Sequence, residues 1–365
     1  MLGPDLRWIG NLRMNAGGSL QIFANPGSVA CGWYWALPSA ELRKGGKREL
    51  DFLGEDLLLY RSESGKVYCI QAYCPHMGAN LKEGRVEGES LRCAFHGWKH
   101  SGSGRCVSTA CSSEKVPANS VARRKSHLVA EKFGMIWIHT HADSESSLDA
   151  VDPLPDFPAL SGFEVTARVD ESEIRNCHPT LILGGGVDEE HFSYVHSQTT
   201  DISGPLRFDF QRISPTVIRY ENKAEIKTTN VKSRFMHRLY RGVLRYGVTY
   251  WYGSTALAEL GPPILPLYSL FCYRPTRDGR TEGLNIYVTK ARRGPIGKLI
   301  SFIALYLTRK ILRNGGSEDA VIQNSIRFQY GPYASGNAPF AAFVRYVEEQ
   351  PYIDLATREV RSCIR

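Results

Sequence analysis

The chain has 365 residues, 42% of them hydrophobic, and a formal net charge of +8. This length is too great for one small core and predicts about two domains. The nine cysteines are scattered through the chain, which argues against a small disulfide scaffold. The first residues lack the apolar run of a signal peptide, and no apolar stretch reaches the roughly 20 residues that span a bilayer. We therefore expect a soluble cytoplasmic protein with mostly free thiols.

The first half of the chain has the pattern of short strands. Aromatic and β-branched residues gather in segments that Gly, Ser and Lys separate. The segments are 56–60, 66–74, 90–98 and 134–140. Residues 142–160 then hold three prolines, which block both helix and strand, so this stretch is the best linker candidate. The expected order is an N-terminal arm (1–30), a small β domain (31–141), the linker (142–160) and a larger domain (161–365).

The second half of the chain mixes helices with strands. Residues 186–196 have helical character, whereas longer segments read as strands. The strand segments are 206–226, 243–256 and 267–290. Asp278-Gly279 is typical of a hairpin turn. Gly315-Gly316-Ser317 predicts the start of a last helix that runs to about Phe328. The fold class expected from this mixture is α+β.

Two Cys/His pairs lie in the small β domain. One residue separates Cys74 from His76, and two residues separate Cys93 from His96. Four such ligands could hold zinc, but a zinc ribbon usually has two Cys-x-x-Cys knuckles. One Cys and one His on each of two loops fit a [2Fe–2S] cluster better, with cysteines on the inner iron and histidines on the outer iron.

Glycines in the same loops support this interpretation. Gly78 and Gly97 would let the backbone come close to a cluster and donate N–H bonds to its sulfurs. Cys106 and Cys111 lie just downstream, and we interpret them as ordinary small thiols.

A second group of metal-ligand residues follows the linker. Asp188, His191 and His196 have the spacing D-x-x-H-x-x-x-x-H. Two histidines and a carboxylate define the facial site of non-haem Fe(II) oxygenases. Residues i and i+5 point about 140° apart on a regular helix, so both histidines can converge only at a π-type turn. A distant carboxylate must complete the site, and Glu318 or Asp319 at a helix start would suit it.

These motifs together resemble the Rieske non-haem iron oxygenases over roughly residues 30 to 352. Segment 74–98 is similar to the Rieske signature, and Ala79 and Ala94 and their neighbours lack the extra cysteines of the respiratory branch. Within this group, the chain is similar to the branch that holds ketosteroid hydroxylases and cholesterol desaturases. This similarity rests on segments 32–42, 72–88, 186–196 and 343–352. Gly184-Gly185-Gly186 departs from that branch, which usually has a polar residue there.

The resemblance implies an all-β Rieske domain and an α+β, helix-grip-like catalytic domain with an antiparallel sheet. It implies a [2Fe–2S] cluster on Cys74, His76, Cys93 and His96, and a mononuclear Fe(II) on His191, His196 and Asp319, with Glu318 as the alternative third ligand. It also implies that Asp188 bridges His191 to His96 of a neighbouring subunit, in a homotrimer. Glu189 and Glu190 remain solvated acids of a helix start.

The implied activity is monooxygenation of a hydrophobic, polycyclic, steroid-like substrate. Desaturation, oxidative dealkylation and oxidative cyclisation are the alternatives. A ferredoxin or an NAD(P)H-dependent reductase would supply electrons as a separate protein, since the chain has no G-x-G-x-x-G segment. Two other classes stay open: a Rieske electron carrier and a zinc-dependent binding module.

The positive charge is concentrated late in the chain. Residues 283–317 contain no Asp or Glu, whereas seven Lys or Arg lie there: Lys290, Arg292, Arg293, Lys298, Arg309, Lys310 and Arg313. The stretch could be a solvated face, or it could dock an acidic donor or an anionic membrane. Nucleic acid is disfavoured because no recognition motif accompanies the charge. The apolar run 299–307 is either a core helix or an interfacial helix.

Overall fold

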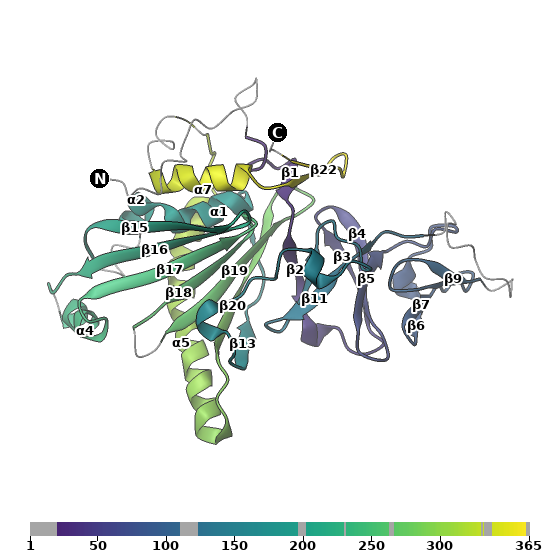
Figure 1. The fold of residues 1–365 in the computed structure, drawn as a ribbon, viewed down its shortest axis with the longest axis horizontal. Helices are drawn as coiled ribbons and strands as arrows, with labels where there is room; N and C mark the ends of the chain where they lie inside the picture. The colour runs from purple at the N-terminus through teal and green to yellow at the C-terminus, as the bar shows by residue number, and fades with distance from the viewer. Residues whose placement is uncertain are drawn as a thin grey trace. The chain divides into compact units, whose positions relative to one another are not determined.

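The computed structural model describes residues 20–109, 123–195, 202–229, 231–262, 266–329, 331 and 338–362 (Figure 1). His196, the π-type turn expected before it, and Cys111 lie outside these residues. The chain divides into two compact units. One comprises Cys31–Leu154, and the other comprises Pro155–Arg365 with the described part of Met1–Ala30.

Cys31–Leu154 is built from short antiparallel strands. They are β2 (Trp33–Pro38), β3 (Lys47–Phe52), β4 (Glu55–Arg61), β5 (Val67–Gln71), β6 (Arg85–Glu87), β7 (Ser90–Arg92), β8 (Lys99–His100), β9 (Cys106–Ser108), β10 (Ser126–His127), β11 (Val129–Lys132) and β12 (Met135–His139). Their sheets have the orders β10-β5-β4-β3, β11-β12-β2 and β6-β7-β8-β9. Two strands are shorter than predicted, because the chain leaves β5 and β7 to form the loops of Cys74 and Cys93.

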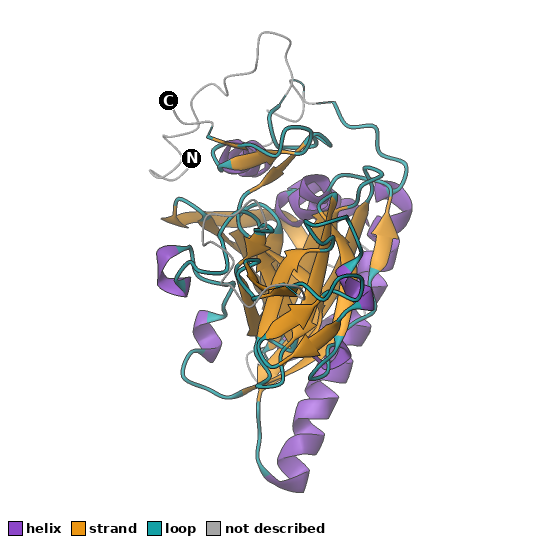
Figure 2. Cartoon of the chain, turned by 90° about the vertical axis from the view of Figure 1, so that its right-hand side faces the viewer, coloured by secondary structure: helices purple, strands orange, loops and turns teal. Residues whose placement is uncertain are grey.

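A large antiparallel sheet dominates the other unit (Figures 1 and 2). Its strands are β13 (Val165–Val169), β14 (Glu173–Arg175), β15 (Ile202–Ser214), β16 (Val217–Ile226), β17 (Val243–Trp251), β18 (Thr255–Leu260), β19 (Leu267–Pro275) and β20 (Thr281–Lys290). The order is β13-β20-β19-β18-β17-β16-β15, with β14 also paired to β20. The predicted hairpin joins β19 to β20, and Gly279 supplies its positive φ of 80°.

Helices pack against this sheet. They are α1 (Pro179–Gly184), α2 (Glu189–Val195), α4 (Val231–Leu239), α5 (Gly294–Gln323) and α7 (Ala338–Glu348). Phe343 and Tyr346 of α7 share a buried cluster with Tyr220 and Tyr250 of the sheet. Among the described residues, no helix is long and apolar enough to cross a membrane.

The predicted helix start at Gly315-Gly316-Ser317 is wrong. Helix α5 runs without a break from Gly294 to Gln323. A glycine inside a helix costs about 1 kcal/mol relative to alanine, so local propensity disfavours this continuity. Contacts from β14 offset that cost: Arg175 donates to the Gly316 carbonyl at 3.3 Å and to Gln323 Oε1 at 3.2 Å.

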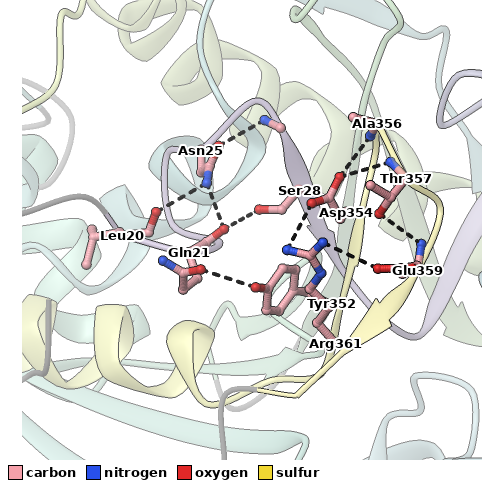
Figure 3. A network of polar contacts seen from close by, with 11 residues as sticks. Leu20, Gln21, Asn25, Ser28, Tyr352, Asp354, Ala356, Thr357, Glu359 and Arg361 are labelled. Atoms are coloured by element: carbon pink, nitrogen blue, oxygen red, sulfur yellow. Dashed lines mark hydrogen bonds and ion pairs between the residues drawn. The ribbon is translucent and has the colours of Figure 1, made fainter. Parts of the chain in front are cut away.

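The described part of the N-terminal arm is tied to the C-terminal segment (Figure 3). Strand β1 (Ser28–Ala30) pairs with β21 (Tyr352–Asp354), which pairs in turn with β22 (Val360–Arg361). The Tyr352 hydroxyl donates to Gln21 Oε1 at 3.1 Å. The Glu348 carboxylate accepts from the N–H groups of residues 21–23 at 2.7–2.8 Å. Residues 20–30 therefore pack as part of the larger unit.

Candidate metal centres

The two Cys/His loops have the same backbone hydrogen bonds. The N–H of Cys74 and that of Cys93 each donate to the carbonyl five residues later, both at 2.8 Å. Gly78 and Gly97 each donate back to the cysteine four residues earlier, at 3.0 and 3.1 Å. Both glycines have positive φ, 71° and 66°, a conformation that disfavours other residues. The two loops therefore form a matched pair.

The ligand side chains divide into an inner and an outer pair. Cys74 and Cys93 are each 3% exposed, whereas His76 is exposed and His96 is half-buried. The two imidazole rings lie 4.6 Å apart between centroids, and His76 stacks on Trp98 at 4.5 Å. Inner thiols and outer imidazoles are the arrangement that a Rieske cluster needs.

The electrostatics of the inner pair also fit a metal cluster. Burial, with a smaller contribution from the nearby Cys93, raises the pKa of the Cys74 thiol to about 11. A thiolate there needs a compensating positive charge, which ferric iron supplies. Among the described residues, no three His, Cys, Asp or Glu side chains are grouped to hold one ion. A Rieske cluster requires only two protein ligands on each iron, so the observed pairs suit it.

The second centre brings together two residues that are far apart in the sequence. His191 on α2 and Asp319 on α5 approach to 2.8 Å between Nε2 and Oδ1. His191 Nδ1 lies 3.0 Å from the Gly185 carbonyl, which can only accept a hydrogen bond. With the ring proton on Nδ1, a cation must lie between Nε2 and the carboxylate. A second ring proton, which makes an imidazolium, or a metal ion would each serve, and the pair is therefore a candidate metal site.

Neighbouring groups fix the backbone on both sides of this pair. The Asp188 carboxylate accepts from the N–H groups of Glu190 and His191, at 3.1 and 3.4 Å, and so caps α2. On α5, Asn324 Oδ1 accepts from the N–H of Asn176 at 2.8 Å. With the Arg175 contacts, this holds the helix turn that carries Asp319. The 2.8 Å contact with His191 makes Asp319 the better placed of the two predicted carboxylate candidates, Asp319 and Glu318.

The three glycines before Asp188 are part of a helical turn that packs closely. They end α1 and form the 3-10 helix η6 (Gly185–Val187). A Cβ on Gly186 would lie 2.4 Å from the Tyr250 hydroxyl, and one on Gly185 would lie 3.3 Å from the His191 ring. The Tyr250 hydroxyl donates to the Leu183 carbonyl at 3.0 Å. Glycine here therefore admits a buried tyrosine beside the candidate iron site.

Sequence reasoning missed three residues near these centres. Arg175 and Tyr250 are distant in sequence from any motif, so no local signal marked them. His100 lies four residues after His96, and its Nε2 is 3.5 Å from Cys74 Sγ. Its position on the strand that directly follows the second loop could have indicated that it lies near the cluster ligands.

The comparisons with known proteins agree with the first of these centres. Residues 32–123 match the family of the Rieske [2Fe-2S] domain. The first unit therefore contains a Rieske domain, and this match confirms the predicted [2Fe–2S] cofactor. Among curated relatives, cholesterol 7-desaturase nvd of Bombyx mori is 34% identical over 46% of this chain and 36% of the relative. The oxygenase component of 3-ketosteroid-9-alpha-monooxygenase of Rhodococcus rhodochrous is 30% identical over 48% and 45%.

Solved structures extend the likeness to the second unit. Dicamba monooxygenase bound to 3,6-dichlorosalicylic acid has a TM-score of 0.59, with 18% identity, and covers 89% of this chain and 98% of that one. NdmA of Pseudomonas putida CBB5 with caffeine has a TM-score of 0.62, with 17% identity, over 86% and 88%. These matches confirm the predicted fold class, whereas the Rieske domain and the curated relatives confirm the resemblance to Rieske oxygenases. The chain spans less than half the length of the curated relatives named above.

Proposed function

We propose that the protein is the oxygenase component of a Rieske-type non-haem iron oxygenase. The observation that carries the proposal is the His191–Asp319 pair, in a chain that also holds a Rieske domain. When bound, the cluster would relay electrons and the iron would activate O₂. The protein's own residues hold and orient these groups: Gly185 fixes the His191 ring, and Arg175 and Asn176 fix the helix of Asp319. The second unit disfavours a simple electron carrier.

The proposed substrate is a hydrophobic, polycyclic, steroid-like molecule, and monooxygenation is the proposed reaction. The names of the two curated relatives support this class. Desaturation, dealkylation and cyclisation by the same centre are the alternatives. The test is product analysis by mass spectrometry after incubation with candidate steroids, a reductase, NAD(P)H and ¹⁸O₂. Monooxygenation adds one labelled oxygen, whereas desaturation removes two hydrogens. A cluster-containing, iron-loaded protein that forms no product from any polycycle would count against the substrate class.

The partners that we infer are an NAD(P)H-dependent reductase, with or without a ferredoxin, in the cytoplasm. We also infer a head-to-tail homotrimer, in which Asp188 joins His191 to His96 of the next subunit. A heterologous contact that closes on itself makes such a ring. The hydrogen bonds of Asp188 described above go to backbone N–H groups at the start of α2, and not to an imidazole. The bridging role of Asp188 is therefore a prediction.

Asp188→Asn is expected to slow electron transfer from cluster to iron by about 10- to 100-fold, the usual cost of losing a group that orients metal ligands. Asparagine is as good an N-cap as aspartate, so α2 and both metals should be retained. Stopped-flow absorbance of the reduced cluster, mixed with O₂ and substrate, measures the rate. Asp188→Ala, which also removes the cap, is the comparison. A monomer in solution with full activity would contradict the ring.

We further propose that the first half of α5 contacts an anionic membrane surface. Large apolar side chains there are exposed: Ile296 (76%), Leu299 (57%), Ile300 (43%), Phe302 (59%), Ile303 (45%) and Tyr306 (48%). Lys298 and Lys310 are exposed beside them. Arg309 and Arg313 contribute less than the sequence suggested, because Asp170 pairs with both, at 2.9 and 3.6 Å.

Helix α4 supports the same contact. Its Val231 and Phe235 are 76% and 65% exposed. Residues 226–258 contain no Asp or Glu but six Lys or Arg. Strands β16 and β20 run in the same direction within the antiparallel sheet. Their C-terminal ends, which precede α4 and α5, therefore lie at the same end of the sheet. Exposed apolar groups interleaved with cations at one end of the sheet fit a bilayer interface better than an acidic protein.

Reversing Lys298 and Lys310 to Glu should weaken binding to phosphatidylserine vesicles at least about 30-fold, at about 1 kcal/mol for each lost cation. Leu299→Asp with Phe302→Asp should release the protein as well, and Val360→Asp, on an exposed strand, is the matched control. Vesicle flotation gives the readout, with turnover of a detergent-solubilised substrate unchanged. If flotation is unchanged but reduction by ferredoxin is slower, the basic surface is a docking site for the electron donor. If neither changes, it is only a solvated surface.

A further inference from the structure

His100 is a buried histidine that neither proposed centre uses as a ligand. Its side chain is 0% exposed, in strand β8. The neighbouring Lys99 points outward and lies 3.6 Å from Glu87, so the alternation of the strand turns His100 inward. Its partners across the sheet, Leu91 and Cys106, are buried as well. The sheet therefore places an imidazole behind the first cluster loop.

The His100 ring makes a polar contact with one of the proposed cluster ligands. His100 Nε2 lies 3.5 Å from the Sγ of Cys74, within the range of a hydrogen bond to sulfur. A cysteine that ligates iron is a thiolate and can only accept, so Nε2 must carry the proton. The other nitrogen, Nδ1, is buried and has no hydrogen-bond partner among the described residues. A buried histidine with one unpaired nitrogen costs stability, which a packing role alone does not explain.

We propose that His100 is a positioning residue that donates a hydrogen bond to the inner cluster ligand Cys74 and thereby raises the reduction potential of the cluster. The inference rests on the proposed cluster ligation and goes beyond it. Reduction adds negative charge that spreads onto the sulfur ligands. A donor aimed at one of these ligands stabilises the reduced state more than the oxidised state. Because the site excludes water, no solvent molecule replaces the bond when it is removed.

The test is the midpoint potential of the full-length, cluster-containing protein, measured by EPR-monitored redox titration. His100→Phe keeps a planar ring but removes the donor. Reduction of the cluster should become about tenfold less favourable, a fall of about 59 mV for one electron. His100→Gln places an amide N–H near the position of Nε2 and should restore most of the potential. His139→Phe, which replaces another buried histidine of the Rieske domain, should leave it unchanged.

Three outcomes would overturn the proposal. They are an unchanged potential in His100→Phe with full cluster content, equal shifts in His100→Phe and His100→Gln, or an equal shift in His139→Phe. If His100→Phe does not assemble a cluster, pulsed EPR of ¹⁵N-histidine-labelled protein decides. A third, weak histidine coupling beyond the two ligands should appear in the wild type and vanish in His100→Gln. Its absence from the wild type would show that no bond reaches the sulfur. Loss of the whole Rieske signal in the wild type would instead refute the cluster itself.

Discussion

Asp319→Ala is expected to abolish turnover while leaving the visible absorption and EPR signal of the Rieske cluster intact. The Asp319 carboxylate and His191 Nε2 face each other at 2.8 Å, and both are only about one-fifth exposed, at 20% and 21%. Removing the carboxylate leaves the iron with histidine ligands alone. Changes to groups that merely orient ligands already cost about 10- to 100-fold, so loss of the ligand should cost more than about 100-fold. Mononuclear iron content and O₂-dependent product formation measure the effect.

Glu318→Ala is the matched control for this experiment, since it removes the adjacent carboxylate from the same helix turn. It should retain most of the activity. If Glu318→Ala is inactive and Asp319→Ala is active, the third ligand lies one residue earlier. His191→Ala and His196→Ala should behave like Asp319→Ala. Full activity in His196→Ala would show that the facial site is assigned wrongly.

The Rieske loops could be predicted from sequence because their constraints are local. Cys74 and Gly78 lie within one turn of chain, and the hydrogen bond between them needs a residue that tolerates positive φ. The second loop repeats this arrangement with Cys93 and Gly97. Spacing and residue type therefore carried most of the geometry. The strand limits were less predictable, since aromatic composition continues into loops that have left the sheet.

The larger unit could be predicted only in part, because its constraints are tertiary. His191 and Asp319 meet across 128 positions of sequence, and the pairing came from a resemblance rather than from spacing. The Gly315-Gly316 pair has the local signature of a helix boundary, yet Arg175 on a neighbouring strand holds α5 continuous through it. Similarly, position 186 requires glycine because the hydroxyl of Tyr250, a residue of strand β17, occupies the space where a Cβ would lie.

Cys93→Ser is expected to remove the Rieske cluster and, with it, all turnover that depends on NAD(P)H. Serine keeps the size of the side chain, but a hydroxyl is a poor substitute for a thiolate on iron. The change lies in Cys31–Leu154, whereas His191 and Asp319 belong to the other unit. The variant should therefore lose acid-labile sulfide and cluster iron but still bind Fe(II) at the second centre. Iron and sulfide analysis, together with the brown-red absorption, measures the loss.

Cys106→Ser is the control for the cluster experiment, because Cys106 is also a buried thiol of the same unit, 7% exposed. Its Sγ is 3.5 Å from the Ser108 carbonyl, a bond that a serine hydroxyl can also make. The control should therefore keep both its cluster and its activity. His96→Ala should lose the cluster as Cys93→Ser does, since it removes a ligand from the outer iron. A colourless wild-type protein that binds zinc through Cys74 and Cys93 would replace the redox centre with a structural one. If the cluster survives Cys93→Ser but not Cys106→Ser, the cysteine ligand of the inner iron is Cys106 and not Cys93.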